Sequence, residues 1–237
     1  MSPQAREQAQ APLAGLILDW GGVLTPDLDA SMSAWADRDG VRYGDFVEVL
    51  DTWLGRTPEP GEAEPVRVTD EASPPARHPS PVHLLEEGRL APEAFEDVLA
   101  AELAARGSRV PARGLLSRML ADLAELDARM LGLVRRAREA GVRTAVLSNS
   151  WGEHYPDALF DELFDTVVIS GRVGMRKPER RIFDHTAAAL GLAAGQCVMV
   201  DDLAANVRAA VAAGMVGVLH TSVATTVAEV EILFDLA

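Results

Sequence analysis

Apolar residues along the chain occur in two kinds of pattern. Short apolar runs bounded by turn residues predict five buried strands, at 13–18, 142–147, 166–169, 197–200 and 215–219. Apolar positions at helical spacing predict helices at 28–37, 46–54, 92–103, 115–123, 130–137, 182–190, 203–213 and 227–236, several of which end at a glycine. Because strands and helices alternate over the second half of the chain, we expect an α/β fold, a parallel sheet with helices on both faces.

The helices between residues 26 and 125 form a block without a strand signal. The first strand has no partner nearby in the sequence, so it must join the sheet that the later strands build. We therefore expect a core of residues 1–25 and 126–237, with the helical block 26–125 inserted into it. Residues 1–12 are interpreted as a loose leader ahead of the fold.

The segment from residue 56 to residue 81 has a different character from the rest of the helical block. It holds seven prolines, with acidic and small residues between them. Prolines at this density interrupt helices and strands, so we predict an irregular loop. A lid over a binding site is the functional alternative, because long irregular loops in compact proteins are often functional. A plain linker is the favoured interpretation.

Composition narrows the class of protein. The formal net charge is −14, which argues against nucleic acid or an anionic membrane surface as the main partner. Hydrophobic residues make up 48% of the chain, yet no apolar stretch approaches the length of a membrane span. The single cysteine, Cys197, fits a reducing compartment, and the first ten residues carry no secretion signal. We expect a cytoplasmic protein.

The most informative stretch is the end of the first strand. Asp19 is the first charged residue after the apolar run, and Trp20, Gly21 and Gly22 follow it. In parallel α/β sheets, ligands bind at the carboxyl ends of the strands. A carboxylate followed by a turn with little side-chain bulk can be approached closely by a substrate, although aspartate is also a common turn-capping residue.

Three further polar clusters follow later strands of the predicted sheet. Ser148 and Asn149 follow the strand 142–147, Lys177 comes after the strand 166–169, and Asp201 with Asp202 follows the strand 197–200. Taken singly, these residues also have bland interpretations as turn residues, a surface charge and a helix cap. A parallel sheet would bring all of them to one edge together with the carboxylate of the first strand.

Such a set has the chemistry needed for phosphoryl transfer. The carboxylate of Asp19 can attack phosphorus and form an aspartyl-phosphate. Together with Asp202 it offers the hard oxygen ligands that suit Mg²⁺. Lys177 supplies a compact positive charge between nucleophile and phosphate, and Ser148 can donate a hydrogen bond to a phosphate oxygen. The expected partner is therefore a small phosphorylated substrate.

The four clusters resemble the four motifs of the haloacid dehalogenase superfamily of hydrolases. The matching segments are Asp19–Leu24, Leu147–Asn149, Gly174–Glu179, and Val200–Asp202 with Asn206. The resemblance implies a Rossmann-like core with a helical cap of the first type, and it is closest to the N-terminal phosphatase domain of soluble epoxide hydrolases. It also implies Asp19 as nucleophile, a phosphate site at Ser148, Asn149 and Lys177, and metal ligands at Asp19, Asp202 and the Gly21 carbonyl, supported by Asp201 and Asn206.

One position departs from the pattern of that family. Most of its phosphatases carry a second aspartate two residues after the nucleophile, and this aspartate protonates the leaving group. The chain has Gly21 there, which has no side chain to transfer a proton. A good leaving group, a water molecule or a cap residue would have to replace it.

Trp151 at the pocket mouth and His83 in the helical block are weaker candidates for the site.

Three functions remain open, in this order. The first is a Mg²⁺-dependent phosphatase of a small phosphorylated metabolite. The second is a catalytically weak or inactive binding or regulatory module, which the missing acid would explain. The third is a 2-haloacid dehalogenase, against which Gly21 and the pair Asp201 and Asp202 both argue. The physiological substrate and the choice between monomer and homodimer are left open by the sequence.

Overall fold

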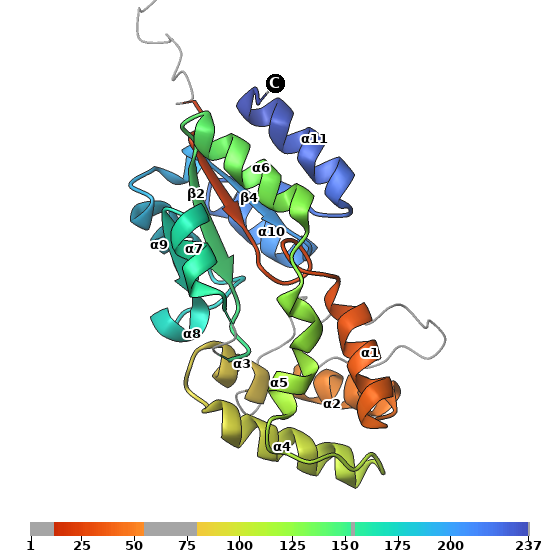
Figure 1. Ribbon diagram of the computed structural model, residues 1–237. Coiled ribbons are helices and arrows are strands. Elements are labelled where there is room, and N and C mark those ends of the chain that lie inside the picture. Colours follow the sequence, from red (N-terminus) through yellow and green to blue (C-terminus); the bar gives the residue numbers. More distant parts are fainter. Residues whose placement is uncertain (1–11, 55–79, 153–154, 237) are drawn as a thin grey trace, which may run out of the picture.

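A parallel sheet forms the centre of the molecule (Figure 1). The structure is a computed structural model, and it describes residues 12–54, 80–152 and 155–236. The sheet has the order β3-β2-β1-β4-β5, and every neighbouring pair is parallel. Its strands are β1 (Gly15–Leu18), β2 (Arg143–Ser148), β3 (Thr166–Ile169), β4 (Cys197–Asp201) and β5 (Val216–Leu219). The first strand thus joins the sheet that the later strands build, as expected. It is the middle strand of that sheet.

Helices cover both faces of the sheet. Successive residues of a strand point to opposite faces, so each strand contributes side chains to both layers of helices. Leu16 and Leu18 face one hydrophobic cluster, which includes residues of α6 (Ala128–Glu139), α7 (Asp157–Leu163) and α11 (Val223–Phe234). Ile17 faces the other cluster, with residues of α9 (Arg180–Ala189) and α10 (Ala204–Ala212). Since both faces are covered, the strands are almost wholly apolar, which is typical of parallel sheets. The α/β prediction is confirmed.

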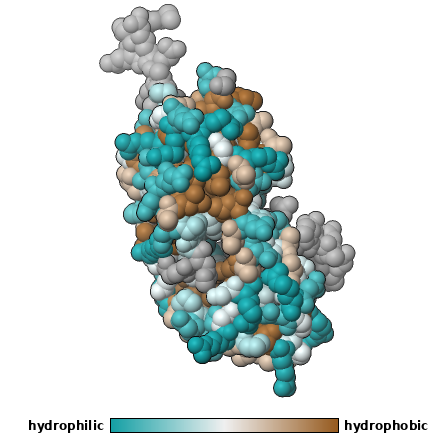
Figure 2. Space-filling model, in the orientation of Figure 1, coloured by the Kyte–Doolittle hydropathy of each residue, from teal (hydrophilic) through white to brown (hydrophobic). Residues whose placement is uncertain are grey.

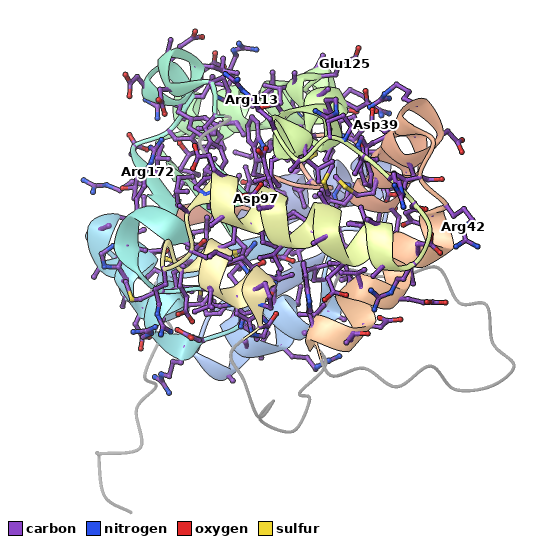
Figure 3. All side chains as sticks on the ribbon, turned by 90° about the horizontal axis from the view of Figure 1, so that it is seen from below. Asp39, Arg42, Asp97, Arg113, Glu125 and Arg172 are labelled. Carbon is purple, nitrogen blue, oxygen red and sulfur yellow. The ribbon has the colours of Figure 1, made fainter. Side chains whose placement is uncertain are left out.

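The chain between β1 and α6 builds a third hydrophobic cluster, separate from the two that flank the sheet. Its elements are α1 (Leu28–Asp39), α2 (Tyr43–Leu54), α3 (Pro81–Glu86), α4 (Pro92–Ala105), α5 (Leu115–Met119) and the short 3-10 helix η2 (Ala121–Ala124). Trp35, Phe46 and Phe95 are fully buried at its centre. Figure 1 shows this block below the sheet, and Figure 3 views it from below, with α4 lying across its outer end and Arg42 at the rim.

Some predicted elements differ from those in the structure. The predicted helix 115–123 is two pieces, because Leu120 leaves helical geometry with φ −93° and ψ 4°. The closing helix starts four residues earlier than 227, because the Ser222 side chain accepts a hydrogen bond from Thr225 N and caps it. The short elements α7, α8 (Ser170–Val173) and η3 (Ala194–Gln196) were not predicted, since three to seven residues give little periodicity.

Most of the predicted proline-rich loop, residues 55–79, lies outside the described residues, as does most of the predicted leader. The end of that loop prediction is wrong. Pro81 is the first residue of α3, because the fixed φ of proline suits the first turn of a helix and its missing N–H is not needed there. Within the described part of the chain, no helix has the length and hydrophobicity to cross a membrane.

Candidate active site

The parallel pairing of β1 with β2 and β4 places the ends of these three strands side by side, and the candidate site lies there. Leu18 of β1 pairs with Val146 of β2 on one side and with Val200 of β4 on the other. Asp19 therefore emerges one residue beyond β1, between the ends of these two strands. Its N–H donates to Val200 O at 2.9 Å, which extends the ladder to the carboxylate-bearing residue itself. This register brings the ends of β1, β2 and β4, with the polar residues that follow them, to one edge of the sheet.

Lys177 lies at the centre of this edge as a buried cation. Its Nζ atom is 2.7 Å from Oδ1 of Asp19 and 2.7 Å from Oδ2 of Asp201. Only 1% of the lysine side chain is exposed. Burial alone disfavours its charge, but the two carboxylates outweigh that effect and raise the pKa of Lys177. The lysine therefore stays charged at neutral pH, acting as a fixed positive charge.

The two neighbouring carboxylates at the end of β4 have different surroundings. Asp201 is fully buried, and its oxygens accept hydrogen bonds from Asn206 Nδ2 and from the N–H of Leu203, besides the contact with Lys177. In contrast, Oδ1 of Asp202 is buried and has no hydrogen-bond partner among the residues that the structure describes. The oxygens of Asp201 are thus occupied by hydrogen bonds to neighbouring residues, whereas one oxygen of Asp202 is available to a ligand.

Buried carboxylates in this arrangement resist ionisation. Burial is the largest cause that raises the pKa of Asp19 to about 7, and Asp201 adds to it, while Lys177 opposes it. Burial again leads for Asp202, with the charges of Asp19 and Asp201 behind it, and its pKa rises to about 8. A cation bound between these groups would offset both effects, because it favours their charged forms.

The residues present fit a divalent cation. Asp19, Asp201 and Asp202 each offer an oxygen, and these atoms lie within 4.8 Å of one another. The partnerless oxygen of Asp202 is what a hard cation such as Mg²⁺ would coordinate. Gly22 leaves room for this carboxylate: it has φ +72°, and a Cβ there would lie 2.5 Å from Oδ2 of Asp202.

Ser148 and Asn149 lie around the same cavity as Asp19 and Lys177. The hydroxyl of Ser148 is 3.0 Å from the hydroxyl of Tyr155. The side chain of Asn149 binds the backbone of Lys177 twice, accepting from its N–H at 2.8 Å and donating to its carbonyl at 3.0 Å. Because both polar atoms of that side chain are used, Asn149 holds the backbone of Lys177 in position.

A cavity of about 120 Å³ opens at this edge, between the sheet and the helical block. Six of the predicted site residues line it: Asp19, Gly21, Ser148, Asn149, Lys177 and Asn206. Asp201 and Asp202 do not line it and lie behind Asp19. Trp151 and His83, the two weaker candidates, also line the cavity. The structure thus brings all the predicted residues into one place.

Sequence reasoning missed the residues that join the helical block to this site. Glu86 of α3 accepts from Arg176 Nε at 2.7 Å and from Trp151 Nε1 at 3.3 Å, and its carbonyl accepts from the Ser170 hydroxyl at 2.5 Å. Tyr155 was missed too. No periodicity marks such contacts, because their partners lie up to 90 residues apart. The position of Arg176 next to Lys177 was the one available signal.

Comparison with known proteins agrees with this fold. The model of the haloacid dehalogenase-like hydrolase family matches residues 13–214, so the chain belongs to that family of hydrolases. A curated relative, the sesquiterpene phosphatase astK of Aspergillus oryzae, is 32% identical over 149 residues, which cover 59% of this chain and 72% of the relative.

Solved structures share the fold at low sequence identity. A HAD family enzyme from Bacteroides thetaiotaomicron, crystallised with magnesium and inorganic phosphate, is 16% identical with a TM-score of 0.59, over 88% of this chain and 94% of that one. A dehalogenase is also 16% identical, with a TM-score of 0.60, over 88% of this chain and 85% of that one. Likeness of fold therefore does not decide between phosphatase and dehalogenase chemistry.

Proposed function

We propose that this hydrolase is a Mg²⁺-dependent phosphatase that acts on a small phosphorylated metabolite through an aspartyl-phosphate on Asp19. The observation that carries the proposal is the contrast at the end of β4. Asp201 is fully hydrogen-bonded and pairs with Lys177, whereas Asp202 keeps a buried oxygen without a partner next to Asp19. Dehalogenation by attack on carbon would give this oxygen no role, while a phosphatase uses it to hold a cation.

The reaction begins at the carboxylate of Asp19. One of its oxygens attacks phosphorus, the bond between phosphorus and the ester oxygen breaks, and the electron pair leaves with that oxygen. Water then attacks phosphorus, the bond to Asp19 breaks, and inorganic phosphate is released. Lys177 stabilises the charge on the phosphoryl oxygens in both steps, and Ser148 with the N–H of Asn149 donates hydrogen bonds to them. Because its pKa is raised, Lys177 does not serve as the acid.

Three groups would hold the cation: the carboxylates of Asp19 and Asp202 and the backbone carbonyl of Gly21. When bound, it supplies the charge neutralisation that lets an anionic nucleophile approach an anionic phosphate. Asp201 acts behind them, since it fixes the ammonium of Lys177 and is itself fixed by Asn206.

We also infer that residues 26–125 act as a cap over this site. The support is the cavity itself, which has walls from both the sheet edge and the helical block. The anchor through Glu86 holds α3 against the segment that carries Lys177. Such a cap excludes water and sets which substrates enter.

The comparisons with known proteins favour phosphate chemistry for this chain. The curated relative is named a phosphatase, and the Bacteroides enzyme was crystallised with magnesium and phosphate. Both facts belong to those proteins, and they favour a phosphatase over the other two functions for this chain.

The test is hydrolysis of para-nitrophenyl phosphate by wild type and by Asp19→Asn, each with and without Mg²⁺. The leaving group of this ester needs little protonation, so Gly21 is no handicap. The proposal expects turnover that requires Mg²⁺ and is lost in Asp19→Asn. No turnover by a folded wild-type protein that binds Mg²⁺ would support a binding module instead. Chloride release from a 2-chloroacid without Mg²⁺ would support a dehalogenase.

A further inference from the structure

The cavity has two chemically different ends. The sheet edge supplies its charged and hydrogen-bonding groups around Asp19 and Lys177. The helical block supplies mostly aliphatic side chains: Leu28, Met32, Leu54, Val82, Leu120 and Leu123. These come from α1, α2, α3 and the α5–η2 segment, so the apolar wall is built by several elements together. Figure 2 shows hydrophobic residues gathered near the middle of the molecule, where the sheet meets the helical block.

Polar groups are scarce on the helical-block side. Among the described residues of the block that line the cavity, only His83 and Glu86 have polar side chains. The carboxylate of Glu86 is already bound by Arg176 and Trp151. A leaving group rich in hydroxyls, such as a sugar, would need several partners here, and each buried hydroxyl without one costs binding free energy.

The turn after the nucleophile continues the apolar wall. Gly21 stands where a proton-donating side chain would be expected, and a Cβ at this position would lie 3.2–3.4 Å from atoms of the Leu28 side chain. When a phosphate ester is bound at Asp19, the space beside its ester oxygen is therefore bordered by the side chain of Leu28. An apolar leaving group suits this space, because it brings no hydroxyl that would need a partner beside the leucine.

On the basis of the proposed phosphatase activity, we propose that the substrate is a phosphate monoester of an apolar organic group. The phosphate binds at the sheet edge, and the apolar group packs against the six aliphatic side chains of the helical block. Burial of each further methylene group then improves binding, by roughly three- to fourfold per group while the cavity still has room.

Two esters of the same size and leaving-group chemistry test this directly. para-Propylphenyl phosphate and para-(hydroxyethyl)phenyl phosphate differ only by a methyl group in place of a hydroxyl at the end remote from phosphorus. We expect kcat/KM for the propyl ester to be at least about tenfold higher, because the hydroxyl loses its water without gaining a partner. Equal values, or a preference for the hydroxyl ester, would overturn the inference while leaving the phosphatase proposal intact. If neither of these esters nor para-nitrophenyl phosphate is hydrolysed with Mg²⁺, the phosphatase proposal itself fails.

A matched pair of variants locates the preference. Leu120→Gln places an amide in the cavity wall and should reduce the ratio of the two kcat/KM values several-fold. Leu90→Gln makes the same change at another partly buried leucine of the helical block, which does not line the cavity, and should leave the ratio unchanged. Thermal unfolding of both variants checks that they are folded. An unchanged ratio in folded Leu120→Gln would contradict the assignment of this wall.

Discussion

The ammonium of Lys177 lies 2.7 Å from a carboxylate oxygen of Asp19, and the two side chains are only 1% and 9% exposed. A buried ion pair of this kind has both a structural and a chemical role. It holds the carboxylate in place, and in the proposed reaction it supplies positive charge to the phosphate that the carboxylate attacks.

Removal of the charge should therefore damage both stability and activity. Lys177→Met leaves two carboxylates, Asp19 and Asp201, buried without their cation, and we expect a loss of about 3–5 kcal/mol in the free energy of unfolding. Activity should fall by a factor of roughly 10² or more. Chemical denaturation and steady-state kinetics measure the two effects.

The control uses an ion pair of the same chemistry at the surface. Arg180 and Asp184 are 3.2 Å apart, with side chains 70% and 49% exposed. Arg180→Met should cost less than about 1 kcal/mol, because exposed pairs are worth little. Similar losses in the two variants would contradict the central role given to Lys177.

Gly22 allows a second comparison between two glycines with similar backbones. Gly22 has φ +72° and Gly40 has φ +69°, so alanine strains the backbone at both, by about 1–2 kcal/mol. Only at Gly22 would the new Cβ collide with Asp202. We expect Gly22→Ala to weaken Mg²⁺ binding at least tenfold and Gly40→Ala to leave it unchanged, as measured by calorimetric titration. Equal Mg²⁺ affinity in both variants would mean that Asp202 is not a ligand.

The sheet and most of its site could be predicted because the residues that determine them are adjacent in the sequence. A strand-length apolar run that ends in Asp19, and another that ends in Asp201, each carry the fold and the chemistry in a few adjacent residues. Parallel pairing then places their ends together. Lys177 was predictable only through its motif, since it is separated from its strand by seven residues and reaches the site through the turn that Asn149 holds.

The contacts of the helical block could not be predicted in the same way. Glu86 meets Arg176 across 90 residues, and the contact between the hydroxyls of Tyr155 and Ser148 corresponds to no periodic sequence pattern. The difference between Asp201 and Asp202 was also beyond the sequence alone. It depends on which oxygens find hydrogen-bond donors in three dimensions.

Ser170 should be a stabilising link between the sheet and the helical block. Its hydroxyl is fully buried, accepts from Ser150 N at 2.7 Å and donates to Glu86 O at 2.5 Å. Ser170→Ala leaves both groups without this partner, and we expect a loss of about 1–3 kcal/mol by chemical denaturation. Thr186→Val is the control, because the buried Thr186 hydroxyl bonds only to a carbonyl of its own helix. A smaller loss in Ser170→Ala than in Thr186→Val would contradict this role.

Stability should depend on pH through His220. Burial lowers its pKa below the usual 6.5, although Asp127 opposes the effect, and its Nδ1 lies 2.8 Å from the Thr226 hydroxyl. The unfolded chain therefore takes up a proton at a higher pH than the folded one. This contribution to stability is present above pH 6.5 and is lost as the pH falls through the lowered pKa of the folded state.

Replacement of the ring should flatten that dependence. We expect the midpoint of thermal unfolding of His220→Gln to fall less steeply below pH 6.5 than that of wild type. His185→Gln, at an exposed position, controls for the loss of a histidine. Parallel curves for wild type and His220→Gln would contradict the prediction.

The most direct test of the central claim is rapid mixing of the enzyme and Mg²⁺ with para-nitrophenyl phosphate, followed by acid quenching and peptide mass analysis. Gly21 offers no side chain to activate the water for the second step, so the account predicts a burst of nitrophenol equal to the enzyme concentration. It also predicts one phosphoryl group on the peptide that contains Asp19. Steady release of nitrophenol without a burst, together with a phosphoryl group found elsewhere or not at all, would contradict attack by Asp19.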